Sequence, residues 1–290
     1  MRVLVLGGSG MLGHALWQAF RDRFDTYVTL RGGANEYPGL FGVGHVLEGV
    51  SANDFDTVVK AVGAVRPDAV VNAIGIIKQA AAAKDDPLAC LTVNALFPHR
   101  LAALCEAGGA RLVHMSTDCV FSGRTGGYRE SDVPDAEDLY GRSKLLGEVD
   151  YGDCLTLRTS IIGRELGSSR GLLEWFLGQN GGTVSGYRRA IFSGFTTHAI
   201  ADVIAWLLAE HPDLRGIWQV ASEPISKYDL LCLLKEHYGL DVEIEPDDTF
   251  ACDRSLDGKR FSQATGFAPT PWPEMVAGLP RHRALQEVAG

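Results

Sequence analysis

The sequence predicts a doubly wound α/β fold, in which helices cover both faces of a parallel sheet and a smaller C-terminal lobe is added. Short apolar runs alternate with helical patterns over roughly the first 160 of the 290 residues, which is typical of βαβ units. The first run passes into the first helical pattern through a glycine-rich turn, residues 7–13, which suits a tight connection from strand to helix.

The expected elements follow in order along the chain. Strands are expected at 2–6, 26–30, 68–72, 111–116 and 154–158, where apolar and β-branched residues form short runs. Helices are expected at 11–24, 55–65, 88–107 and 140–149, where apolar residues recur with helical spacing. Beyond Thr159 we expect a helix at 197–209, a strand at 217–221, a helix at 226–238 and an irregular tail at 267–273.

The regular alternation ends near Thr159, and glycine-rich stretches follow around 163–171 and 178–186. We therefore expect one domain over residues 1–160 and a substrate-binding lobe over residues 161–290. Segment 197–221 is expected to return to the first domain, because it again pairs a helix with a strand.

Composition and charge exclude several classes of protein. The formal net charge of −9 argues against nucleic acid as a partner. We find no apolar run of about 18 residues that would predict a membrane span, and no signal-peptide layout. The six cysteines lack metal-binding or disulfide spacing, so we expect reduced thiols, no metal site and a cytoplasmic protein.

The glycine turn predicts a nucleotide-binding, Rossmann-type domain. Gly7 permits a tight turn, Gly10 lets a pyrophosphate approach the backbone, and Gly13 allows close packing of the helix. Met11 and Leu12 begin that helix, whose N-terminal N–H groups would face the phosphates. A merely flexible turn is the alternative, but the flanking strand and helix favour a dinucleotide site.

The end of the second expected strand bears on the choice of cofactor. NAD-binding proteins commonly place an Asp or Glu there, on the ribose. This chain has Arg31, followed by Gly32 and Gly33. A cation suits the extra phosphate of NADP(H), which we therefore favour over NAD(H), although a surface arginine would look the same.

Tyr140 and Lys144 are the candidate catalytic residues. Four residues apart on a helix, they share one face, where the ammonium would lower the pKa of the phenol. Such a phenol exchanges protons in carbonyl–alcohol chemistry. Thr117 follows the strand 111–116 and could hydrogen-bond the reacting oxygen. Ser116 competes with it, but strand alternation lets only one of the two point into the site.

Other residues are expected to wall the cofactor. Asn72, Ala73 and Gly75 end a neighbouring strand, and Ser116, Tyr140 and Lys144 are also expected to contact the cofactor. Asn94, on the long helix 88–107, could hydrogen-bond backbone near the site or have a structural role alone.

Three segments together resemble the extended short-chain dehydrogenase/reductase family, and within it the dTDP-4-dehydrorhamnose reductases most. They are GGSGMLG at 7–13, STDCVFSG at 116–123 and YGRSKLLGE at 140–148. The resemblance implies that Thr117, Tyr140 and Lys144 form a catalytic triad. It also implies NAD(P)H-dependent reduction of the 4-keto group of a nucleotide-linked 6-deoxyhexose, as in rhamnose and cell-surface polysaccharide synthesis. Extended family members are often dimers, which leaves a homodimer open.

The substrate side departs from that family, so the sugar and the nucleotide (dTDP, UDP or GDP) remain open. Residues 75–79 read GIIKQ, and Ile161 stands where a tryptophan is common. The arginines and lysines that could bind the phosphates of the nucleotide sugar could equally be solvated residues on the surface. We expect substrate contacts from Lys78, Asp118, Val120, Phe121, Trp175, Arg188, Arg254 and Arg260.

Two rival functions remain. The first is an epimerase or dehydratase of the same superfamily, which would retain its nicotinamide through turnover; release of oxidised cofactor separates it from a reductase. The second is a cofactor-binding regulatory subunit, like the resembling subunit of methionine adenosyltransferase. A stable complex with a larger enzyme, without turnover of any ketosugar, would support that function.

Overall fold

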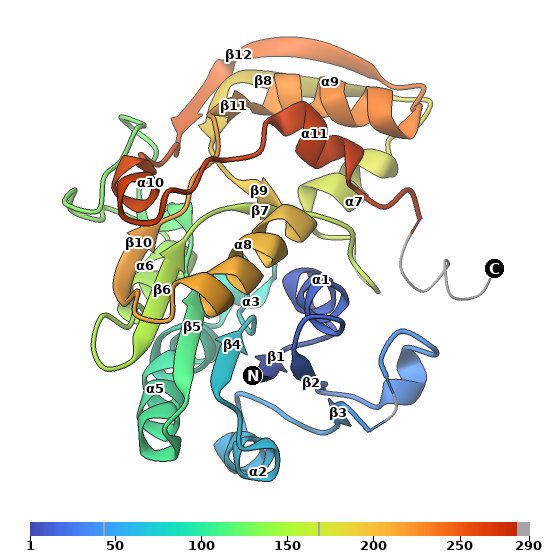
Figure 1. The fold of residues 1–290 in the computed structure, drawn as a ribbon. Helices are drawn as coiled ribbons and strands as arrows, with labels where there is room; N and C mark the ends of the chain where they lie inside the picture. Colours follow the sequence, from blue (N-terminus) through green and yellow to red (C-terminus); the bar gives the residue numbers. More distant parts are fainter. Residues whose placement is uncertain (43, 168, 283–290) are drawn as a thin grey trace.

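The computed structural model describes residues 1–42, 44–167 and 169–282. Its main element is a seven-stranded sheet in the order β10-β6-β5-β4-β1-β2-β3, with parallel pairing throughout. The predicted doubly wound α/β fold is confirmed, as Figure 1 shows. The strands are β1 (Arg2–Leu6), β2 (Asp25–Thr29), β3 (Val46–Leu47), β4 (Ala69–Asn72), β5 (Arg111–Met115), β6 (Cys154–Arg158) and β10 (Gly216–Gln219).

Two apolar cores cover the two faces of this sheet. Alternation along β1 sends Val3 into one core and Leu4 into the other. The first core is closed by helices from both halves of the sequence, and the second core is closed by helices that lie between β2 and β5 in the chain. The first contains α1 (Met11–Phe20) and α8 (Thr197–Glu210), and the second contains α2 (Phe55–Val65) and α5 (Phe97–Gly108).

The C-terminal region adds a small three-stranded sheet in the order β11-β8-β12. Strand β12 was not expected, because its sequence EIEPDDTFACD is too polar to show apolar alternation. Helix α8 packs on the main sheet and strand β10 pairs within it, as expected for segment 197–221. The boundaries of the two domains remain a prediction. The added elements are β7 (Ile161–Ile162), α7 (Leu172–Leu177), β8 (Thr183–Phe192), β9 (Phe195–Thr196), β11 (Ile225–Ser226), α9 (Lys227–Tyr238), β12 (Glu243–Asp253), α10 (Lys259–Thr265) and α11 (Trp272–Ala277).

The single helix expected at 88–107 is divided into three parts. They are α4 (Pro87–Cys90), a π-helical turn η2 (Leu91–Leu96) and α5. By length and composition the stretch Pro87–Gly108 could cross a membrane, which corrects the expectation that no such run exists. Half of it is buried inside the structure, where Val93, Phe97 and Leu101 pack under the sheet, and a core helix passes the same test.

Several boundaries differ from the prediction for local reasons. Helix α1 ends at Phe20 instead of residue 24, because a turn precedes β2. Helix α6 (Leu139–Leu146) ends before Gly147, whose backbone lies against the carbonyl of Asn94. Helix α11 begins inside the tail that was expected to be irregular. The short elements η1 (Ala34–Glu36), α3 (Ala82–Asp85) and η3 (Asp118–Val120) were not expected.

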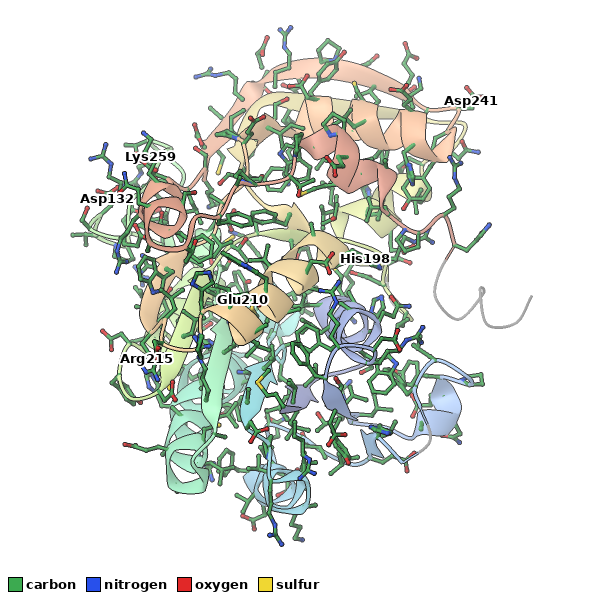
Figure 2. The ribbon with its side chains drawn as sticks, viewed as in Figure 1. Asp132, His198, Glu210, Arg215, Asp241 and Lys259 are labelled. Atoms are coloured by element: carbon green, nitrogen blue, oxygen red, sulfur yellow. The ribbon has the colours of Figure 1, made fainter. Side chains whose placement is uncertain are left out.

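Charged side chains cover the outer surface of this scaffold. Figure 2 labels examples that project outward from the helices and connections, among them Asp132, Glu210, Arg215 and Lys259. The charged side chains that line the candidate active site are described next.

Candidate active site

A cavity of about 310 Å³ lies at the carboxyl ends of β1, β4, β5 and β6. Its walls come from the segments directly after those strands, where ligands of doubly wound sheets bind. A second cavity, of about 360 Å³, adjoins it under β8, α9 and β12. We call the first the strand-end cavity and the second the lobe cavity. They share Lys78, Gln79, Asp118, Cys119, Ser160, Leu172, Phe192 and Lys227.

The glycine turn has the shape of a phosphate-binding turn. Gly7 has a positive φ of 88°, and a Cβ on Gly13 would lie 2.0 Å from the carbonyl oxygen of Gly7. Gly10 caps α1 without a side-chain hydrogen bond, so the first N–H groups of α1 are available to an anion. Gly10, Met11 and Leu12 line the strand-end cavity, while Gly7 and Gly13 support them from behind.

The end of β4 forms the opposite wall. Ala73 and Gly75 line the strand-end cavity, as predicted for the cofactor side. Asn72 is fully buried and lies behind this wall instead. Its Nδ2 pairs with His114 Nδ1 at 3.1 Å, and its Oδ1 accepts a hydrogen bond from the backbone N–H of Ile74 at 3.1 Å. Asn72 therefore shapes the wall without contacting the cavity.

Asn94 hydrogen-bonds backbone near the site, one of the two roles considered for it. Its Oδ1 accepts from the backbone N–H of Ile76 at 2.8 Å, and its Nδ2 donates to the carbonyl of Ile76 at 3.0 Å. Nδ2 also donates to Ser143 Oγ at 3.2 Å, which joins the wall after β4 to helix α6. Its position in a π-helical turn resembles other functional sites, where such turns recur.

Tyr140 and Lys144 both line the strand-end cavity from α6. Burial raises the pKa of the Tyr140 phenol well above its ordinary value, with the neighbouring Cys119 adding to the rise and a hydrogen bond to Thr117 opposing it. The pKa of the phenol is therefore raised overall and not lowered toward working pH, as had been expected. The phenol stays neutral, which is the form that can donate a proton.

Lys144 has a different partner from the one expected. Its Nζ donates a hydrogen bond to the carbonyl oxygen of Met115 at 2.6 Å, at the end of β5. Burial lowers the pKa of this ammonium to about 8, and the carboxylate of Glu148 opposes the shift. Lys144 thus titrates close to neutral pH while Tyr140 does not.

Ser116 and Thr117, the two hydroxyls after β5, both line the strand-end cavity, although strand alternation predicted that only one would point into the site. Thr117 is buried at the cavity, donates to Asp118 Oδ1 at 3.1 Å and bonds Tyr140. Ser116 donates to Glu148 Oε1 at 2.6 Å. Glu148 in turn receives two hydrogen bonds from buried Arg158, at 2.8 and 2.7 Å. Ser116 thereby ties the strand end to the segment after α6.

The boundary between the two cavities carries most of the charge. Together the linings contain four cationic residues, Lys78, Lys144, Lys227 and Arg254, and one carboxylate, Asp118. Burial raises the pKa of Asp118, while hydrogen bonding to Cys119 and the nearby cations oppose the rise. In a chain with a net charge of −9, this local excess of positive charge favours an anionic ligand.

Four of the eight predicted substrate residues line these cavities, namely Asp118, described above, and Lys78, Arg254 and Trp175. Lys78 Nζ lies 2.6 Å from Asp138 Oδ2, the carboxylate that caps α6. Arg254 donates to the carbonyls of Phe121 and Ser122, at 2.9 and 3.0 Å. Trp175 lines the lobe cavity with 41% of its surface exposed.

Four others are not brought to the cavities. Val120 and Phe121 are fully buried, and Phe121 stacks on Tyr128 with ring centroids 4.3 Å apart. Arg188 pairs with Asp248 on the exposed side of β8. Arg260 stacks on the ring of Trp218 at 3.8 Å, beside a different hollow. These side chains have structural partners in place of a ligand.

Sequence reasoning missed three residues of the lobe cavity. Lys227 lies at its boundary with the strand-end cavity, and Tyr187 and Phe250 form its aromatic end, with ring centroids 5.2 Å apart. No local motif marks them, because they reach the site only through the packing of β8, α9 and β12. The exposure of Tyr187 and Phe250, 37% and 50%, is visible only in the fold.

The family model described as RmlD substrate binding domain matches residues 1–277. The chain belongs to this family. The resemblance to the extended short-chain dehydrogenases/reductases is thereby confirmed. Among the described residues no group of three or more His, Cys, Asp or Glu side chains could hold a metal ion.

Relatives and solved structures agree with this membership. The chain is 35% identical over 150 residues to "Methionine adenosyltransferase 2 subunit beta" of Danio rerio, covering 51% of this chain and 42% of that one. It is 42% identical over 71 residues to a dTDP-4-dehydrorhamnose reductase of Mycobacterium tuberculosis, covering 23% of each. These matches span less than half the length of either relative.

Solved structures are similar over nearly the whole chain. A hypothetical dTDP-4-dehydrorhamnose reductase from Sulfolobus tokodaii has a TM-score of 0.75 and 27% identity, covering 94% of this chain and 98% of its own. The Bacillus anthracis dTDP-4-dehydrorhamnose reductase in complex with NADP has a TM-score of 0.77 and 21% identity, covering 95% and 96%. The second likeness is one of fold alone.

Proposed function

We propose that this protein is an NAD(P)H-dependent reductase of the 4-keto group of a nucleotide-linked 6-deoxyhexose. One observation carries the proposal: Thr117, Tyr140 and Lys144 line one cavity together with the uncapped N-terminus of α1. That arrangement places a neutral proton donor beside a dinucleotide-binding turn. The relatives named dTDP-4-dehydrorhamnose reductase supply the class of substrate.

The residues present fit a nicotinamide dinucleotide. The N–H groups at the start of α1 would bind its pyrophosphate, because Gly13 lets that helix lie against the Gly7 carbonyl. Ala73 and Gly75 would wall the rest of the cofactor with little side chain in the way. When bound, the nicotinamide supplies the hydride that no side chain can provide.

NADP(H) is our choice over NAD(H). Arg31 is exposed directly after β2, and within the described residues its guanidinium makes no hydrogen bond or ion pair. It is therefore available to a 2′-phosphate, which a guanidinium can bind through two parallel hydrogen bonds.

The proton for the new alcohol would come from Tyr140. Burial keeps its phenol protonated, and Thr117 interacts with the phenol oxygen in the same cavity. Thr117 would hold the carbonyl oxygen in the same place. Lys144, anchored on the Met115 carbonyl 2.6 Å away, would keep a positive charge beside the phenol and the ribose.

The adjoining cavities suit the remainder of a nucleotide sugar. Trp175, Tyr187 and Phe250 offer aromatic surface at the far end of the lobe cavity, where a planar base could stack. The excess of cations between the two ends suits a diphosphate. The choice of dTDP over UDP and GDP follows from the relatives named dTDP-4-dehydrorhamnose reductase.

A regulatory subunit is the second candidate function. It is favoured by the 35% identity over 150 residues to a subunit of methionine adenosyltransferase. The presence of all three catalytic side chains around one cavity supports the reductase instead. A cofactor-bound protein that turns over no ketosugar yet forms a stable complex with a methionine adenosyltransferase would reverse this preference.

We also propose a cytoplasmic protein that works without nucleic acid or membrane, as a homodimer. Leu88, Leu91 and Leu96 on α4 and η2 are all exposed, which favours a second copy on that face. Light scattering coupled to size exclusion would measure the mass, and a 31.3 kDa particle at all concentrations would remove the homodimer.

The test of the proposed function is oxidation of NADPH and NADH, followed at 340 nm with dTDP-, UDP- and GDP-linked 4-keto-6-deoxyhexoses. Turnover with release of oxidised cofactor would establish the reductase and exclude an epimerase or dehydratase. Lack of turnover with all three ketosugars, despite measurable NADPH binding, would contradict the proposal.

A further inference from the structure

Lys227 occupies an unfavourable position for a lysine. It is the first residue of α9, where the helix dipole disfavours a cation. Ser226 and Asp229 already satisfy that helix end, with the Asp229 N–H donating to Ser226 Oγ at 3.0 Å. Its side chain is partly buried, and its ammonium lies 3.7 Å from the centre of the Phe192 ring. A residue that breaks local rules in this way is often functional.

The other cations around the cavities already have partners. Lys78 is paired with Asp138, Lys144 is bonded to the Met115 carbonyl, and Arg254 is bonded to two backbone carbonyls. The Lys227 ammonium makes no hydrogen bond or ion pair within residues 1–42, 44–167 and 169–282. Asp118 attracts it, but not within ion-pair distance, and Arg254 repels it. Its positive charge is therefore uncommitted.

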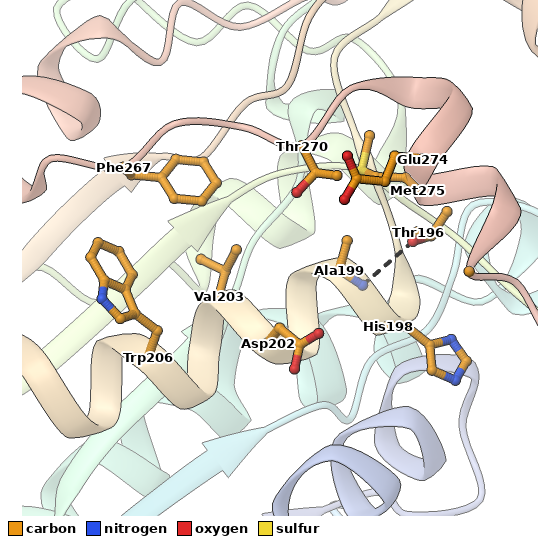
Figure 3. A pocket seen from close by; sticks show the side chains of 11 residues that line it. Thr196, His198, Ala199, Asp202, Val203, Trp206, Phe267, Thr270, Glu274 and Met275 are labelled. Carbon is orange, nitrogen blue, oxygen red and sulfur yellow. Dashed lines mark hydrogen bonds between the residues drawn. The ribbon is translucent and has the colours of Figure 1, made fainter.

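The location of Lys227 identifies the part of a ligand that it would meet. It lines both cavities, between the end that holds Tyr140 and the end that holds Phe250. A nucleotide sugar with its ketone at Tyr140 and its base on the aromatic residues must pass its diphosphate across this boundary. The hollow between α8 and α11 in Figure 3, of about 400 Å³, contains no lysine or arginine and offers no comparable site.

We infer that Lys227 binds the diphosphate of the nucleotide-sugar substrate, and that it sets the preference of the lobe cavity for a doubly charged linker. The inference rests on the proposed function, because it assumes a ligand that spans both cavities. Binding supplies the anion that the ammonium lacks, as a charge-assisted hydrogen bond. The Phe192 ring holds the side chain in place beforehand.

The experiment measures binding to the NADPH-saturated protein by calorimetry, with dTDP and UDP against thymidine and uridine. We expect Lys227→Met to lower the affinity for both nucleoside diphosphates at least tenfold. The affinities for NADPH and for the nucleosides should stay within twofold of the wild type. Lys227→Arg should restore most of the lost diphosphate affinity. Arg188→Met, which removes an exposed arginine paired with Asp248 outside both cavities, is the matched control and should change nothing.

Each outcome decides between the proposals. If the wild type binds the diphosphates tightly and Lys227→Met binds them equally well, the role of Lys227 is overturned and the proposed function is unaffected. An equal loss for diphosphates and nucleosides would assign Lys227 to packing and also overturn it. A wild-type protein that binds no nucleoside diphosphate would remove the proposed function itself.

Discussion

The strand-end cavity and the lobe cavity share eight residues but are built in opposite ways. Most of the strand-end cavity is formed by short segments that directly follow β1, β4, β5 and β6, and helix α6 adds Tyr140 and Lys144. The lobe cavity collects Trp175, Tyr187, Lys227 and Phe250 from four elements that meet only when β8 pairs with β12. Local sequence therefore marks most of the strand-end cavity, whereas long-range packing forms the aromatic end of the lobe cavity.

The largest effect is expected at Tyr140. Tyr140→Phe removes the proton donor from the strand-end cavity and leaves the lobe cavity intact. Turnover of the ketosugar should fall by about 100-fold or more, within the range that general acid catalysis contributes. Affinity for NADPH and for dTDP should stay within about twofold. A variant with near wild-type turnover would contradict the assignment of Tyr140.

The second effect tests whether the glycine turn shapes the strand-end cavity without affecting the lobe cavity. In Gly13→Ala the new Cβ would lie 2.0 Å from the Gly7 carbonyl oxygen, so α1 must shift. We expect NADPH affinity to fall by about tenfold or more and unfolding free energy by about 1–3 kcal/mol. Affinity for dTDP should be preserved, since the lobe cavity does not contain this turn.

Gly63→Ala provides the control for that variant. Gly63 lies in α2, where a Cβ meets nothing within 4 Å. The substitution should leave NADPH binding unchanged and raise stability by up to about 1 kcal/mol, measured by urea unfolding. Equal losses in the two variants would mean that the turn is not a special position.

The third effect concerns pH. Lys144, with a pKa of about 8, loses its positive charge as pH rises through that value, whereas the raised pKa of Tyr140 keeps the phenol neutral. Turnover should therefore be highest below pH 8 and fall about tenfold per unit above it. Lys144→Arg should remove this alkaline decline, because arginine stays charged. A decline that persists in Lys144→Arg would point to another group.

The smallest effect separates the two nicotinamide cofactors. Arg31→Glu should weaken NADPH relative to NADH by about tenfold, since it replaces a free guanidinium by a carboxylate facing the same position. Fluorescence titration of both cofactors measures the ratio. An unchanged ratio would remove Arg31 from cofactor choice and leave NADP(H) without a structural basis.

The success of sequence reasoning follows the same division. Apolar runs and glycine positions predicted β1, β4, β5, β6 and the turn before α1, because these signals lie within a few residues of each other. The prediction failed for β12, whose polar sequence is held by pairing with β8. The structure places Arg188 and Arg260 outside both cavities, beside Asp248 and Trp218, which are distant from them in sequence. Lys227 gave no signal, because a single lysine in the first turn of a helix usually faces solvent.

The pKa of Tyr140 shows the same limit within the site itself. Helical spacing correctly placed Lys144 on the same helix, but the sequence could not reveal that its ammonium reaches back to Met115. Nor could it reveal how deeply the phenol is buried, which is what raises its pKa. Spacing predicts neighbours, whereas desolvation depends on the whole fold.

The register shift in β12 has a consequence for how this protein can change. Between the paired positions Asp247 and Ala251, three residues of β12 face one residue of β8. Phe250, which lines the lobe cavity, is one of these three. Because they stand outside the regular ladder, their number and chemistry can vary without breaking strand pairing. Substitutions or insertions in this part of β12 can therefore adapt the lobe cavity to new ligands, while the reacting groups in the strand-end cavity stay unchanged.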